Sequence, residues 1–259
     1  MANYNDLLKN ITEDTDIEQY LNDFFDAKKY KDYEVSNNPD ADQIKAIKIM
    51  FNSKKDIVER IRKALDYDSY CIEAFFSYLL ISEDAYVQVS FDSYCENAKE
   101  YGSFNQYQKY CFIKIMELYV DFCLDINNIT KAIKIQRLIL ILTNSSKPEY
   151  ISKLAYMYFS IEDSDNFYKL YTDATFSVYE YLLLIITLLK HDEELRAKEV
   201  LLDMHKNIEY ADYVDHVWDL DKNDIVQKNI IDAVEGCYDD ISSIPTFFSW
   251  FNGVLDSAK

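Results

Sequence analysis

The chain has 259 residues, of which 49% are hydrophobic, and its formal net charge is −19. So acidic a surface repels phosphate backbones and anionic bilayers, which argues against nucleic acid and membrane partners. Only three glycines and three prolines are present, whereas a β-rich protein of this size needs many turns built from those residues. We therefore expect an all-α fold, with 23 tyrosines and 15 phenylalanines filling the space between helices.

The sequence also bears on location and redox state. Met1 is not followed by the basic and then apolar stretches of a secretory signal. The most apolar segment, Tyr179 to Leu189, is shorter than the roughly 20 residues that span a bilayer. The five cysteines are odd in number and widely spread, which favours buried reduced thiols. We expect a cytoplasmic protein.

Residues 1–66 are expected to form an N-terminal helical section that packs on the remainder of the chain. Apolar residues from Ile17 to Phe25 recur at the spacing of one buried helix face, and Thr15 or Asp16 can cap this helix. Two further helices are predicted over residues 40–51 and 55–65.

In residues 67–259 a two-helix unit is predicted to recur. Equivalent positions in the second helices, Ala132, Phe167 and Ala197, lie 35 and 30 residues apart. This interval is typical of solenoids built from α-hairpins. We therefore predict one continuous right-handed solenoid of about ten to twelve helices. The predicted pairs are 71–82 with 84–101, 106–124 with 129–143, 149–160 with 165–174, and two helices within 176–207.

These pairs resemble the tetratricopeptide repeat. In the unit at 176–207 its pattern of small and large residues falls on Tyr181, Leu184, Ile185 and Leu188, and then on Ala197, Leu201 and Met204. The match is degenerate, because Ile185 stands where the family usually has a small residue and Phe167 stands where it usually has alanine.

The C-terminal third resembles the ending of tetratricopeptide proteins of the suppression-of-tumorigenicity type and their small bacterial relatives. The likeness rests on Asn207 to Val214 and Ile244 to Phe251. It implies an intracellular helical repeat and no known chemistry. Pro245 is expected to begin a last helix whose apolar residues cap the stacked core. These residues are Phe247, Phe248, Trp250, Phe251 and Leu255.

Signatures of catalysis, cofactors and metals are missing from the sequence. The isolated glycines cannot form a phosphate-binding loop. The segment from Asp219 begins like a calcium loop, but Asp224 and Ile230 stand where that loop needs glycine and glutamate. We expect no catalytic residue, cofactor or bound metal. A metal-dependent hydrolase that uses His205, His216 and nearby acids is the least favoured alternative.

The resemblance to tetratricopeptide domains implies a concave face that binds a partner. Two groups of residues fall at positions that line this face in the family. The first is Lys114, Glu117 and Asp121, and the second is Tyr156, Phe159, Tyr179 and Ile186. Aromatic stripes also occur where helices simply pack on one another, so packing against a neighbouring helix is the alternative for the second group.

The sequence therefore favours a non-enzymatic adaptor that binds a protein or peptide of basic or mixed charge on an acidic, aromatic-lined concave face. The alternative is an inhibitor of the immunity type, which would neutralise a basic toxin or nuclease. The oligomeric state stays open.

Overall fold

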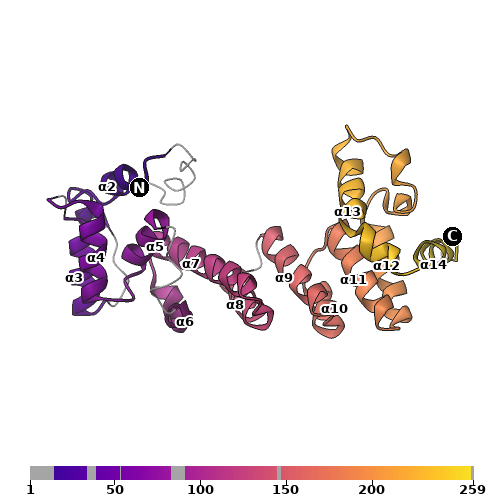
Figure 1. The fold of residues 1–259 in the computed structure, drawn as a ribbon, viewed down its shortest axis with the longest axis horizontal. Helices are drawn as coiled ribbons and strands as arrows, with labels where there is room; N and C mark the ends of the chain where they lie inside the picture. The colour runs from indigo at the N-terminus through magenta and orange to yellow at the C-terminus, as the bar shows by residue number, and fades with distance from the viewer. Residues whose placement is uncertain (1–14, 34–38, 53, 83–90, 145–146, 258–259) are drawn as a thin grey trace. The chain divides into compact units, whose positions relative to one another are not determined.

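The computed structural model describes residues 15–33, 39–52, 54–82, 91–144 and 147–257. Every regular element among them is a helix, and these residues contain no strand (Figure 1). The all-α prediction is therefore confirmed. The chain forms two compact units, Met1–Ile135 and Gln136–Lys259. The boundary expected after residue 66 falls inside a helix of the first unit.

The first unit consists of helices of 6 to 20 residues that are joined by polar turns. Helix α3 packs on α4, α4 on α5, and α5 and α6 on α7, so helices that are close in sequence are also neighbours in space. Residues 84–90 of the helix expected at 84–101 lie outside the described residues. The α-helices are α2 (Ile17–Phe24), α3 (Ala41–Met50), α4 (Ile57–Tyr67), α5 (Ile72–Ile81), α6 (Phe91–Glu96), α7 (Gln106–Asp125) and α8 (Ile129–Leu142), the last of which continues into the second unit.

Aspartate and asparagine begin these helices in place of glycine and proline. Asp16, Asp40, Asp56 and Asn105 each accept a hydrogen bond from a backbone N–H of the first helical turn. Such a cap satisfies a donor that has no partner within the helix. The expected cap of α2 is therefore confirmed at Asp16.

A buried arginine connects three helices of the first unit. Arg60 on α4 is 1% exposed, and its guanidinium donates to the carbonyl oxygens of Phe25 (3.0 Å) and Met50 (2.7 Å). These carbonyls lie at the C-terminal ends of α2 and α3, where helix dipoles place partial negative charge. A third bond joins Arg60 to the side chain of Asn22. Burial lowers the pKa of Arg60, while Asp56 and Asp26 oppose that shift.

Replacing this guanidinium should destabilise the protein strongly. Arg60→Met keeps an aliphatic side chain but removes the hydrogen-bond donors, so the buried carbonyl groups at the helix ends lose their partners. We therefore expect the free energy of unfolding to fall by about 3 kcal/mol. Urea denaturation followed by circular dichroism measures it. The matched control is Arg62→Met, since Arg62 is exposed on the same helix. Equal effects of the two substitutions would contradict the role of Arg60.

The second unit is organised around one helix. Helix α11 packs on α9, α10, α12 and α13. Its run from Tyr181 to Leu188 is buried throughout, as expected of a helix that is apolar on all sides. The α-helices are α9 (Pro148–Ser160), α10 (Ser164–Asp173), α11 (Val178–Lys190), α12 (Glu194–Asn207), α13 (Ile225–Ser242) and α14 (Phe247–Asp256).

The end of the chain differs from the prediction in one respect. The last helix, α14, begins at Phe247, so Pro245 lies in the preceding turn and not at the start of the helix. Phe247, Phe251 and Leu255 are buried and α14 packs on α12, whereas Phe248 stays 37% exposed.

Three inter-helix turns share one backbone geometry. Asn127, Glu162 and Asp192 have positive φ angles of 57°, 55° and 59°. The next N–H in each turn bonds to the carbonyl five residues back, over 2.7, 3.0 and 2.8 Å. The turns lie 35 and 30 residues apart, and each is followed five residues later by a fully buried Ala132, Phe167 or Ala197. Local geometry therefore repeats at the interval found in the sequence.

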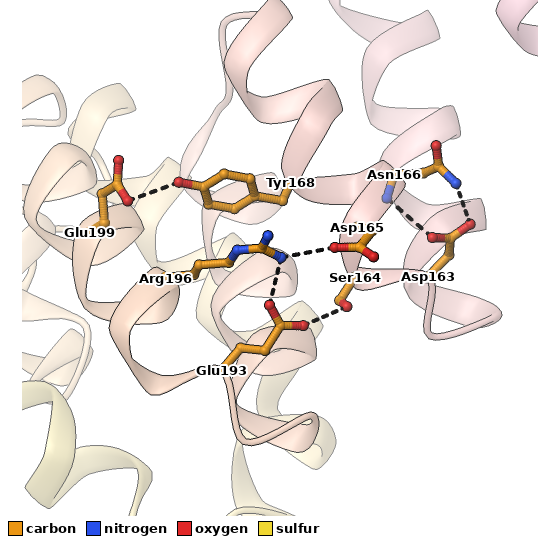
Figure 2. A network of polar contacts seen from close by, with 8 residues as sticks. All are labelled: Asp163, Ser164, Asp165, Asn166, Tyr168, Glu193, Arg196 and Glu199. Atoms are coloured by element: carbon orange, nitrogen blue, oxygen red, sulfur yellow. Dashed lines mark hydrogen bonds and ion pairs between the residues drawn. The ribbon is translucent and has the colours of Figure 1, made fainter.

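Side chains of α10 and α12 form hydrogen bonds between residues that are separated by a similar interval (Figure 2). Arg196 donates to Asp165 (2.9 Å) and to Glu193 (2.7 Å), and the Tyr168 hydroxyl donates to Glu199 (2.9 Å). The Ser164 hydroxyl donates to Glu193 over 2.7 Å. Both the Asp165–Arg196 and the Tyr168–Glu199 pairs are separated by 31 residues, one more than the 30 residues between the turns at Glu162 and Asp192.

Relief of the strain in one of these turns should stabilise the second unit. A left-handed backbone costs a residue with a Cβ roughly 1 kcal/mol, and glycine avoids this cost. We expect Asp192→Gly to raise the thermal midpoint by about 2 °C. His191→Gly is the control, because His191 has φ −98° and gains nothing from glycine. A fall in the midpoint of Asp192→Gly, measured by calorimetry, would contradict this account.

Candidate functional site

A buried carboxylate fixes the start of α11, from which the candidate site is built. Glu180 is 4% exposed and accepts hydrogen bonds from the Ser177 backbone N–H (2.6 Å), from the Ser177 hydroxyl and from the Ser152 hydroxyl of α9. This capping box satisfies donors at the helix N-terminus and joins α9 to the first turn of α11. Val178 and Tyr179, which lie between Ser177 and Glu180, are thereby positioned.

Tyr179 lies between three helices of the second unit. Its ring packs against Gly236 of α13, where an added Cβ would lie 3.2 Å from a ring carbon. Burial is the main reason that the pKa of the Tyr179 phenol is raised, and Cys237 and Tyr156 add to the shift. Tyr156 of α9 is 53% exposed. Two of the aromatic residues singled out from the sequence are therefore close to each other.

Phe159 belongs to the same neighbourhood. The Lys190 ammonium of α11 lies 5.4 Å from the centre of the Phe159 ring and 3.1 Å from a carboxylate oxygen of Asp240 on α13. Residues from α9, α11 and α13 thus contact one another on this side of the unit. Ile186 differs from Tyr156, because it is fully buried in the core and its side chain is out of reach of a partner.

A hollow opens beside Tyr179. Its volume is about 530 Å³, and it lies between the start of α11, the end of α12 and the first half of α13. Glu209 and Asp232 are the charged residues among its described lining residues, and both are acidic. The lining consists of Ser177, Val178, Tyr179, Asn207, Ile208, Glu209, Val226, Asn229, Ile230, Asp232 and Ala233.

The other predicted site residues belong to the first unit and are described separately. On α7, the Lys114 ammonium lies 2.6 Å from a carboxylate oxygen of Glu117. The same ammonium is 5.8 Å from the centre of the Tyr110 ring. Lys114, Glu117 and Asp121 are all partly exposed. The charge of Glu117 is therefore partly balanced within its own helix.

The first unit also contains an acidic cavity that the sequence did not reveal. Its volume is about 280 Å³, and its lining includes Asp40, Asp68, Glu73 and Glu100. Glu73 is 2% exposed and accepts hydrogen bonds from the Tyr33 hydroxyl (2.6 Å) and the Gln108 amide (2.7 Å). The pKa of the Asp68 carboxyl is raised, mainly by burial and also by neighbouring acids that include Asp40.

In the part of the chain that the structure describes, the histidines are exposed and most cysteines are buried. His216 pairs with Asp215, and His191 and His205 are exposed. No group of three or more His, Cys, Asp or Glu side chains in this part of the chain has a metal-binding arrangement. Four cysteines are buried, and the pKa of the partly buried Cys95 thiol is raised to about 11 by burial above all.

Comparisons with other proteins supply no relative. No protein-family model matches the chain, and neither the curated proteins nor the solved structures contain a significant match. Among the described helices, none has both the length and the apolar character needed to cross a membrane.

Loss of the Glu180 carboxylate should loosen the start of α11. We expect Glu180→Ala to lower the free energy of unfolding by about 2 kcal/mol, because several hydrogen-bond donors lose a buried acceptor. Glu199→Ala is the control, since Glu199 is exposed and accepts a single bond from Tyr168. Denaturant titration of both variants checks this, and an effect of Glu180→Ala no larger than the control would refute it.

Proposed function

We propose that this chain is a non-enzymatic, tetratricopeptide-like adaptor that binds a protein or peptide of basic or mixed charge. Its helical hairpins would stack as a right-handed solenoid. The repeated turns at Asn127, Glu162 and Asp192 support such hairpins. The pairs between α10 and α12, both separated by 31 residues, support a regular step between successive units.

The observation that carries the proposal is the aromatic surface of α9 and α11. Tyr156 is 53% exposed, and it lies near the partly buried Tyr179 and on the same helix as Phe159. Tyrosine suits a binding surface, because it offers a large apolar ring and a hydroxyl at small entropic cost. First helices of successive hairpins would supply the concave face, and here α11 contacts both α9 and α13.

The negative net charge of the chain indicates the kind of partner that it would bind. A net charge of −19 favours encounter with a basic surface, and such complementarity raises association rates more than it sets final affinity. We propose that Lys114, Glu117 and Asp121 supply charged contacts on the first unit, and that Tyr156, Phe159 and Tyr179 supply aromatic contacts on the second unit. Ile186 is not included because it is buried.

Charge reversal tests the proposal directly. Association with a labelled Lys-rich peptide should be measured by stopped flow, beside a Glu-rich peptide of the same apolar content. We expect Glu117→Lys combined with Asp121→Lys to slow binding of the Lys-rich peptide about tenfold at low salt, and less at high salt because ions screen the charges.

The control changes net charge equally at other exposed sites, Glu18→Lys with Asp42→Lys. It should slow association less. Equal binding of the Lys-rich and Glu-rich peptides, or a rate indifferent to ionic strength, would overturn the proposed function.

A further inference from the structure

Both aliphatic and acidic residues line the hollow beside Tyr179. Val178, Ile208 and Ile230 supply aliphatic side chains from three different segments. Its volume of about 530 Å³ falls within the roughly 300–1,000 Å³ of ligand-binding pockets. It is therefore large enough to receive a bulky side chain together with part of the backbone that carries it.

The electrostatics of the hollow favour a cation next to that side chain. Glu209 and Asp232 supply two carboxylates. Helix α12 ends at Asn207, which also lines the hollow. The last carbonyl groups of a helix have no partner within it and carry the negative end of its dipole. Lys206 and Lys228 are near in sequence but are not part of the described lining.

One apolar residue that lines the hollow is exposed to solvent. Val226, in the first turn of α13, is 44% exposed and lines the hollow. Ile225 beside it is 79% exposed but is not a lining residue. Of these two neighbouring residues, Val226 is the one that is placed to contact an occupant.

We propose that this hollow receives one anchor of the partner, a bulky aliphatic or aromatic side chain that is adjacent to a lysine or arginine. The inference rests on the proposed binding function and assigns part of its specificity to the second unit. The apolar side chain would pack on Val178, Val226 and Ile230, and the cation would lie near Glu209, Asp232 and the end of α12.

The two neighbouring residues of α13 provide a matched test. Fluorescence anisotropy should be measured on the full chain with three labelled peptides on one Gly/Ser scaffold, which carry Phe-Lys-Arg, Ala-Lys-Arg or Phe-Glu-Glu. We expect the Phe-Lys-Arg peptide to bind at least about tenfold more tightly than the other two. Val226→Arg should weaken its binding about tenfold or more, because it removes an apolar contact and adds a repelling charge.

Ile225→Arg makes the same chemical change one residue away and should alter affinity less than about threefold. Glu209→Gln with Asp232→Asn should reduce the salt dependence of binding while leaving the preference for Phe over Ala. Circular dichroism melting curves confirm that each variant is folded.

The outcomes separate this inference from the proposed function. If the basic peptides bind but Val226→Arg and Ile225→Arg act equally, the anchor site is wrong and the adaptor function stands. If the Phe-Glu-Glu peptide binds as well as Phe-Lys-Arg, or if none binds, both fail. If sedimentation shows a dimer that Val226→Arg dissociates, the hollow is covered by a second copy of the chain and the anchor proposal is overturned.

Discussion

The second unit depends on the burial of one helix, α11. From Tyr181 to Leu188, α11 has no polar face, so it is stable only when other helices cover it on every side. Helices α9, α10, α12 and α13 all contact it. The hollow beside Tyr179 lies at one end of this cover, between the start of α11, the end of α12 and the first half of α13.

Buried polar groups determine where the helices meet. Glu180 joins the start of α11 to Ser152 of α9, and Arg60 joins the ends of α2 and α3 to α4. An apolar surface alone allows helices to slide along one another, whereas a buried donor or acceptor is costly unless its partners are in place. These contacts therefore convert a general preference for burial into a particular arrangement within each unit.

Part of the organisation could be read from the residues because it depends on local geometry. The helix near Ile17 follows from apolar spacing and from the cap at Asp16, and the helix α9 begins at Pro148, which suits the first helical position. The turns at Glu162 and Asp192 follow from short polar interruptions. The start of α14 was misplaced by two residues, because a proline that suits a first helical turn also suits the turn before it. Ile186 was assigned to a surface, although repeat position alone does not reveal which neighbours cover a side chain.

The sequence by itself determined that the described residues are helical, that three turns between helices recur at intervals of 35 and 30 residues, and that the net charge is negative. Periodicity, capping and net charge are properties of neighbouring residues or of simple sums, so no spatial information is needed to recognise them. Only the tertiary structure decided that Arg60 reaches Phe25, that Tyr179 lies on Gly236, and that Ile208 and Val226 border one hollow. Those pairings depend on how helices distant in sequence pack, and burial of apolar surface, being non-directional, does not specify them in advance.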